Sequence, residues 1–322
     1  MSEHRSIAPR VAGSTREGHR PLLLGLAGDS ASGKSTLSHG IEYILGVDRV
    51  GRVCTDDYHR FDRAGRAERD VTPLSPEANR LDLLAGHLRD LASGRPVTKP
   101  TYDHLTGSFG PHETIEPGEI VIVEGLLPLT DRGTRDAIDV AVFLEPEESL
   151  RHRWKLERDV FDRGYSPAEV VRELKRREPD AARYVRPQRG YADVVVRFHR
   201  DRLEEVGPLA ARVAVRPTVP YPELRELVGS LDGDGPVRWS SGTDRRGPMS
   251  VLEIRSDCPP EVGAALEEVI WSRLRPDDRL QRDRIGIVRR PGHDDERSES
   301  LALAQLLVVA FLVGRFDEAF EL

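Results

Sequence analysis

Short runs of apolar residues recur along the first two thirds of the chain, separated by stretches with helical periodicity. The apolar runs are nearly continuous, as in strands buried on both faces of a sheet, and occupy residues 22–28, 50–55, 119–125, 138–145 and 191–198. Helical spacing appears in residues 34–45, 75–94 and 146–177, the last broken near 164–167. Strands that alternate with helices predict an α/β fold, a mainly parallel sheet with helices on both faces.

Local signals at both ends support the helix expected over 75–94. Ser75 is a suitable N-cap, Pro76 suits the first helical position, and Gly94 is a typical terminator. The stretch 99–110 follows this helix and precedes the next strand, so we expect it to be a connecting loop.

The pattern changes after about residue 200. Pro and Gly cluster at 216–222 and 229–248, and the second cluster is expected to be a loop or disordered. Short strands are expected at 209–217 and 249–256, then helices at 260–274 and 298–322. We therefore expect a core over 21–200 and a C-terminal mixed α+β extension of the same sheet over 201–322, in the same domain. The polar residues 1–20 are expected to form a flexible tail.

Composition narrows the class of protein. Hydrophobic residues make up 38% and charged residues 32% of the chain, and the net charge is −7, so neither nucleic acid nor an anionic membrane is the expected partner. The longest apolar stretch, 301–313, is shorter than the roughly 20 residues that span a bilayer. With two cysteines, Cys54 and Cys258, the chain has neither a disulfide framework nor a zinc cluster. We expect a cytoplasmic protein.

A phosphate-binding loop follows the first predicted strand. The sequence "GDSASGKS" (28–35) fits G-x-x-x-x-G-K-[S/T] and opens a predicted helix, the context that this motif requires. Its glycines let successive backbone N–H groups point at phosphate oxygens, while Lys34 can reach the β- and γ-phosphates and Ser35 can bind Mg²⁺. The nucleotide is expected to contact Gly28, Asp29, Ser30, Ala31, Ser32, Gly33, Lys34, Ser35 and Thr36.

A second polar stretch, "TDDYHRFDR" (55–63), follows the second predicted strand. It therefore lies at the carboxyl end of the sheet, where ligands bind in open α/β folds. An Asp there could accept the proton of a hydroxyl that attacks the γ-phosphate, and His59 and Arg63 could hold the acceptor. A GTPase of the Ras type is excluded, because the single Asn of the chain, Asn79, lies outside any N-K-x-D motif.

Several motifs together carry a resemblance to a known family. These motifs are "GLAGDSASGKST", "CTDDYHRFDRAGR", "PLSPEANRLDLL", "KPTYDHLTG", "VIVEGLLPL", "KLERDVFDRGYS" and "REPDAARYVRPQRGYADVVV". They resemble those of phosphoribulokinase and occur in the order that this family shows. The resemblance is greater to the plant and cyanobacterial branch than to the short proteobacterial one. The similarity runs from about 22 to 198 and resumes more weakly at 249–254 and in the last helix. The resemblance implies a P-loop kinase fold, a homodimer, and transfer of phosphate from MgATP to the 1-hydroxyl of D-ribulose 5-phosphate.

The resemblance also assigns roles to individual residues. Asp56 would be the catalytic base, with Lys34 and Arg158 acting on the transferring phosphate. Glu124 would hold Mg²⁺ together with Ser35, and Arg177 would lie on a lid over ATP. The acceptor sugar phosphate would bind His59, Arg63, Tyr102, His104, Lys155, Arg158 and Arg163.

One departure from the family's pattern leaves the identity of the acceptor open. The family has His where this chain has Leu127, on the acceptor side of the site, and Leu cannot form a hydrogen bond. The alternatives are a uridine kinase or another pentose-phosphate kinase of the same superfamily. A non-catalytic nucleotide-binding regulator is the alternative from another class.

Overall fold

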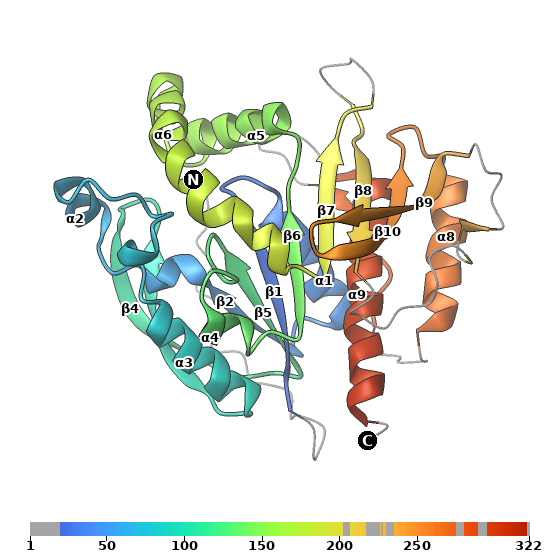
Figure 1. The fold of residues 1–322 in the computed structure, drawn as a ribbon, viewed down its shortest axis with the longest axis horizontal. Coiled ribbons are helices and arrows are strands. Elements are labelled where there is room, and N and C mark those ends of the chain that lie inside the picture. The colour runs from blue at the N-terminus through green and yellow to red at the C-terminus, as the bar shows by residue number, and fades with distance from the viewer. Residues whose placement is uncertain are drawn as a thin grey trace.

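The computed structural model describes residues 20–201, 207–216, 226, 228–229, 235–274, 280–288 and 295–320. Within these residues, eight strands form the main sheet, in the order β2-β5-β1-β6-β7-β8-β10-β9 (Figure 1). They are β1 (Leu22–Gly28), β2 (Val50–Cys54), β5 (Ile120–Gly125), β6 (Val140–Leu144), β7 (Val194–His199), β8 (Ala210–Val215), β9 (Val237–Asp244) and β10 (Gly247–Ile254). The tail expected over 1–20 lies outside the described residues except for Arg20.

The sheet has two parts that differ in strand direction. Neighbouring strands from β2 through β5, β1 and β6 to β7 are parallel. Strands β8, β10 and β9 continue it with antiparallel pairing. This confirms the predicted α/β class, with a mainly parallel sheet and a C-terminal mixed extension of it.

The helices and smaller elements occupy the connections. The α-helices are α1 (Lys34–Leu45), α2 (Arg63–Glu68), α3 (Leu81–Ala92), α4 (Arg132–Arg135), α5 (Glu148–Phe161), α6 (Pro167–Asp180), α8 (Pro260–Arg273) and α9 (Glu299–Phe320). Short helical turns are η1 (Thr55–Tyr58), η2 (Pro76–Ala78), the π-helical η3 (Ala181–Val185) and η4 (Arg186–Tyr191). Among the described residues, two small antiparallel sheets pair β3 (Val97–Asp103) with β4 (Ser108–Ile115), and β11 (Ile287–Val288) with β12 (Glu296–Arg297).

Both faces of the sheet are covered, because the strands are apolar on both sides. On β1, Leu22, Leu24 and Leu26 join the core formed with α1, α8 and α9, while Leu23 joins a second core with α3. Among the described residues, no helix is both long and apolar enough to cross a membrane. The apolar residues of α9 from Leu301 to Leu312 are instead buried between α1, α8 and the sheet (Figure 1).

The stretch expected to be a loop at 99–110 is mostly a β-hairpin. Strands β3 and β4 pair in antiparallel register from Val97 opposite Ile115 to Asp103 opposite Ser108. The prediction was wrong because most residues of β4 are exposed, so this strand lacks the apolar alternation that would identify it. The hairpin carries Tyr102 and His104 to the edge of the sheet that bears the phosphate loop.

Two other element predictions need correction. The helix expected to begin at Ser75 starts at Leu81 instead, because Asn79 is extended and pairs with His59 in a β-bridge. The loop expected over 229–248 contains β9, whose Ser, Gly and Thr residues form a strand through pairing with β10 rather than through local propensity. The helical break near 164–167 is confirmed by α5 ending at Phe161 and α6 beginning at Pro167.

The core between α3 and the sheet gives the first testable prediction. Replacing the buried Leu88 by Ala removes methyl groups from the cluster that contains Leu23 and Val53 and leaves a cavity. The free energy of unfolding should therefore fall by about 2–5 kcal/mol. The exposed Arg89→Ala on the same helix should change stability by less than about 0.5 kcal/mol. Urea denaturation followed by circular dichroism measures both, and equal effects would contradict the packing described.

Candidate active site

The phosphate loop turns from β1 into α1 with the backbone geometry that its sequence predicts. Gly33 has φ +90° and Gly28 has φ +155°. A Cβ at Gly28 would lie 2.7 Å from the Leu144 carbonyl oxygen, so only glycine fits there. The Lys34 Nζ donates hydrogen bonds across the loop to the carbonyls of Gly28, at 2.9 Å, and Asp29, at 2.8 Å.

Asp56 lies immediately after β2, in η1, and His104 reaches it from the β3–β4 hairpin. The His104 Nε2 is 3.4 Å from the Asp56 Oδ2. Burial acts to raise the pKa of Asp56, but the hydrogen bond from His104 and nearby positive charge, including Lys34, outweigh it and hold the pKa below its usual value. Asp56 is therefore ionised at neutral pH.

His59 is buried and held in one tautomer. The Asn79 amide nitrogen donates to the carbonyls of Pro73 and Ser75, so the Asn79 Oδ1 is the atom that faces the His59 Nδ1, at 2.8 Å. Because Oδ1 can only accept, Nδ1 must carry the proton. Burial lowers the pKa of His59, so the ring is neutral at pH 7 and its Nε2 is an acceptor.

Arg63 binds the hairpin turn. Its guanidinium donates to the carbonyls of His104, at 2.5 Å, and Leu105, at 3.4 Å. Arg66, which the sequence did not single out, is buried and donates to the Tyr102 hydroxyl at 2.7 Å. Both arginines thus hold the hairpin that carries Tyr102 and His104.

The second acid of the Asp56–Asp57 pair has a structural environment. The Lys99 Nζ lies 2.6 Å from the Asp57 Oδ2, and the Tyr102 backbone N–H donates to the Asp57 Oδ1 at 2.8 Å. Lys99 is buried, and its hydrogen bond to Asp57 helps to raise its pKa even though burial acts in the opposite direction. The ion pair therefore fastens the hairpin to η1.

Three cations from α5 and the segment after it share one buried carboxylate, Asp159. The Lys155 Nζ is 2.5 Å from Oδ2, while Arg158 at 2.8 Å and Arg163 at 3.3 Å approach Oδ1. The Arg158 Nη2 also donates to the Ser30 Oγ of the phosphate loop, at 3.2 Å. The sequence predicted the three cations but not that all three would share one buried carboxylate.

The Asp159 carboxylate balances only part of the positive charge of Lys155, Arg158 and Arg163. Burial, followed by the charge of Arg177, lowers the pKa of Lys155 to about 8. Arg177 lies on α6, where its Nε donates to the Glu173 carboxylate at 2.9 Å. The site thus has more positive charge than its own acids balance.

Glu124 ends β5 beside the phosphate loop. Its carboxylate accepts hydrogen bonds from Arg52, at 2.7 Å, and from the Ser38 hydroxyl, at 2.8 Å. Arg52 therefore supplies the countercharge of this largely buried carboxylate, so charge balance alone does not require a metal here. Among the described residues, no group of three or more His, Cys, Asp or Glu could hold a metal ion. The Ser35 hydroxyl and the Glu124 carboxylate are oxygen donors that fit Mg²⁺, because this ion takes one or two protein ligands and completes its shell with phosphate oxygens and water.

Leu127, which replaces the family histidine, is buried in a small apolar cluster with Leu74, Leu126, Ala181 and Val185. This cluster lies beneath η3, at the end of α6. The Leu127 side chain therefore serves packing rather than polar contact with an acceptor.

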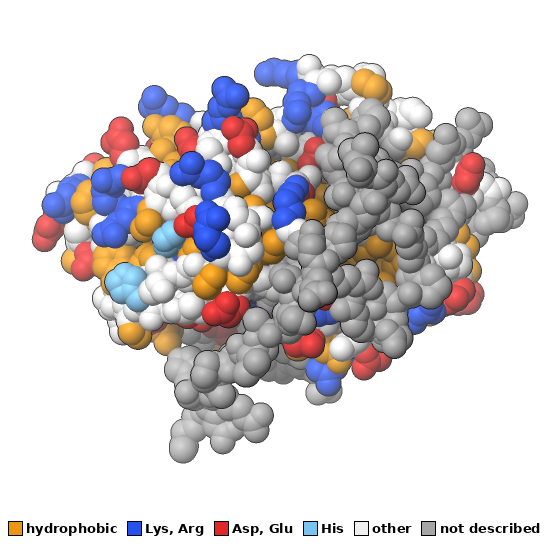
Figure 2. All heavy atoms as spheres, turned by 90° about the horizontal axis from the view of Figure 1, so that it is seen from below, with side chains coloured by type: hydrophobic (Ala, Val, Ile, Leu, Met, Phe, Trp, Pro, Cys, Tyr) orange, Lys and Arg blue, Asp and Glu red, His pale blue; other side chains and the backbone are white. Residues whose placement is uncertain are grey.

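One face of the molecule has mixed charge. On the face seen from below the view of Figure 1, Lys and Arg side chains are interspersed with Asp and Glu among the described residues (Figure 2).

The fold and the phosphate loop define a nucleotide-binding α/β protein of the P-loop kinase class. The family model described as "Phosphoribulokinase / Uridine kinase family" matches residues 23–204, and the chain belongs to this family. Phosphoribulokinase of Synechocystis is 40% identical over 186 residues, which cover 58% of this chain and 56% of that protein. Chloroplastic phosphoribulokinase of Triticum aestivum is 34% identical, covering 55% of this chain and 48% of that protein.

Two other relatives extend the comparison. Uridine kinase of Lactobacillus johnsonii is 34% identical, covering 55% of this chain and 86% of that protein. The solved structure of phosphoribulokinase from Rhodobacter spheroides superposes with a TM-score of 0.58 at 18% identity, covering 78% of this chain and 95% of that chain, and supports the fold. The chain spans about half the length of the phosphoribulokinases of Synechocystis and Triticum aestivum.

The Asp57–Lys99 pair yields a prediction about stability. Lys99→Met leaves Asp57 buried without this cation, so we expect the free energy of unfolding to fall by about 3 kcal/mol. Lys175→Met, on the exposed surface of α6, is the matched control and should be nearly neutral. Thermal and urea denaturation compare the two variants, and a Lys99→Met protein as stable as its control would refute the role of the pair.

Proposed function

We propose that the chain is a kinase that uses MgATP to phosphorylate a hydroxyl of a sugar phosphate, with D-ribulose 5-phosphate as acceptor and D-ribulose 1,5-bisphosphate as product. The main support is the cluster of Lys155, Arg158 and Arg163 around Asp159, since three cations on one carboxylate leave a net positive charge for an anion. A nucleoside such as uridine has no phosphate that would need this charge. The identity to phosphoribulokinases agrees with this choice.

The proposed mechanism begins with Asp56. Its ionised carboxylate accepts a hydrogen bond from the attacking hydroxyl, orients it, and takes its proton as the new bond to the γ-phosphorus forms. The bond from that phosphorus to the bridging oxygen of ADP breaks, and ADP leaves with the electron pair. Since its pKa is below the usual value, Asp56 is a weak proton acceptor, and its first contribution is orientation. Phosphoryl transfer tolerates a weak base, because its transition state is loose and the proton leaves late.

Positive charge then stabilises the transferring group. Lys34 reaches the β- and γ-phosphates, and Arg158, which already contacts the loop at Ser30, approaches the γ-phosphate. The other loop residues and Arg177 on α6 hold the nucleotide. Ser35 and Glu124 would hold Mg²⁺, which would neutralise part of the phosphate charge there.

The acceptor would lie between the hairpin and the cation cluster. The His59 Nε2, left as an acceptor by the Asn79 contact, would take a hydrogen bond from a sugar hydroxyl. Tyr102 and His104 would line the pocket, and Lys155, Arg163 and Arg63 would bind the acceptor phosphate. Each charge-assisted hydrogen bond would contribute roughly 1.5–3 kcal/mol.

An acceptor panel tests the proposal. ADP release with MgATP should be fastest with D-ribulose 5-phosphate, slower with ribose 5-phosphate, and near background with uridine. Asp56→Asn should lower kcat by about 10²–10⁴ because it removes the base. Turnover of uridine but not of the sugar phosphate would overturn the substrate, unimpaired Asp56→Asn would overturn the base, and no turnover with any acceptor would favour a regulator.

Lys155 gives a prediction about pH. With a pKa of about 8 it loses its charge as pH rises, while the acceptor phosphate keeps both of its charges. We expect kcat/KM for the acceptor to fall as pH rises through about 8. The Lys155→Met variant should have a lower kcat/KM for the acceptor, and this kcat/KM should not fall as pH rises through about 8. A wild-type profile that is flat from pH 7 to 9 would exclude a role for the Lys155 charge.

The homodimer, which the family resemblance implies, and the cytoplasmic location, which the composition suggests, also stay proposals. Light scattering of the purified chain tests the first, with a monomeric mass as the contrary result, and cell fractionation tests the second.

A further inference from the structure

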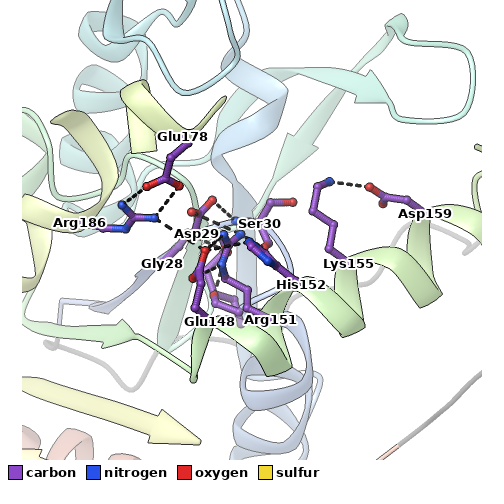
Figure 3. A network of polar contacts seen from close by, with 12 residues as sticks. Gly28, Asp29, Ser30, Glu148, Arg151, His152, Lys155, Asp159, Glu178 and Arg186 are labelled. Carbon is purple, nitrogen blue, oxygen red and sulfur yellow. Dashed lines mark hydrogen bonds and ion pairs between the residues drawn. The ribbon is translucent and has the colours of Figure 1, made fainter. Parts of the chain in front are cut away.

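Arg151 is a buried residue of α5 to which the proposed reaction assigns no part. Its Nη1 donates to the backbone carbonyl of Ser30, at 3.2 Å, and lies 3.4 Å from the Asp29 carboxylate (Figure 3). Its Nε and Nη2 donate to the two Glu148 oxygens, at 2.9 and 2.5 Å. The guanidinium thus joins the apex of the phosphate loop to the first turn of α5.

The apex of the loop is the part that most needs support. Ala31 has φ +62°, a left-handed conformation that is unfavourable for a residue with a side chain. Such a residue keeps this conformation only where its surroundings impose it. The Asp29 carboxylate accepts from the Ser30 N–H at 2.6 Å, and Arg151 holds both of these residues immediately before Ala31.

Glu148 extends the contact toward α6. Besides Arg151 it contacts His152, at 2.9 Å, and lies 3.9 Å from Arg186. Arg186 in turn binds both oxygens of Glu178, at 2.5 and 2.8 Å. The network therefore runs from the phosphate loop through α5 to the carboxyl end of α6, across the π-helical turn η3 (Figure 3).

We infer that Arg151 is a positioning residue for the nucleotide: it fixes the apex of the phosphate loop so that the backbone N–H groups point at the phosphates. This role rests on the proposed use of MgATP. Arg151 needs no contact with the phosphates, since its Nε, Nη1 and Nη2 already donate to the protein. Its effect should fall on binding of the nucleotide and leave the acceptor pocket unchanged.

The test compares Arg151→Met with Arg153→Met on the same helix, where Arg153 pairs with the half-exposed Glu157 at 2.8 Å. Calorimetric titration gives Kd for MgATP, and steady-state kinetics give the two KM values separately. Because two charge-assisted contacts to the loop are lost, Arg151→Met should raise Kd and KM for MgATP by at least about tenfold. The KM for the acceptor should stay within about twofold, and Arg153→Met should match the wild type.

A second substitution separates positioning from stability. Glycine adopts a positive φ without strain, so Ala31→Gly in the Arg151→Met protein should recover several-fold of the lost MgATP affinity. If Arg151→Met does not fold, Arg151→Lys takes its place, and it should bind MgATP more weakly than the wild type with an unchanged KM for the acceptor.

Three results would overturn the inference. They are MgATP affinity within about twofold of the wild type in the folded variant, equal losses for nucleotide and acceptor, and no recovery by Ala31→Gly. A wild-type chain that binds no MgATP would overturn the proposed function as well, so the two failures are distinguishable.

Discussion

The site depends on holding cations close together before any anion arrives. Like charges repel, and the structure offsets this repulsion with buried carboxylates placed among the cations. Asp159 is the centre of this arrangement: Arg158 and Lys155 hold the pKa of its carboxyl below the usual value even though burial acts in the opposite direction. It fixes the positions of Lys155, Arg158 and Arg163 while neutralising only one of their charges. The remaining positive charge is what makes the site suitable for phosphate groups.

The fold brings these charges together through the direction of its strands. Because β1, β2, β5 and β6 are parallel, the loops that follow them meet at one edge of the sheet. The phosphate loop follows β1, Asp56 follows β2, Glu124 ends β5, and α5 with its cations comes after β6. The hairpin β3–β4, fastened by the buried Asp57–Lys99 pair, supplies the remaining wall.

The sequence predicted the features that local chemistry determines. Helix 34–45 was predicted to the residue, because the glycine turn before it and the apolar spacing within it are both local. The hairpin over 97–115 was missed, since an exposed strand has no apolar pattern. The contacts of Arg151 were also missed, because Ser30 and Asp29 come next to it only in the fold. The partners of Asp159 are local in the sequence, but the fold sets the burial that makes Asp159 a shared carboxylate rather than a solvated one. Asn79 shows the same limit: its contact with His59 delays to Leu81 the start of a helix that the sequence placed at Ser75.

The central claim is that the acceptor pocket recognises a phosphate group. Calorimetric titration of the protein with D-ribulose 5-phosphate and with D-ribulose measures this directly, because the open-chain forms of the two ligands differ only in that group. The account predicts that the phosphate increases affinity by at least about a hundredfold, as expected for two or more charge-assisted hydrogen bonds. Equal affinities for the two sugars would contradict it.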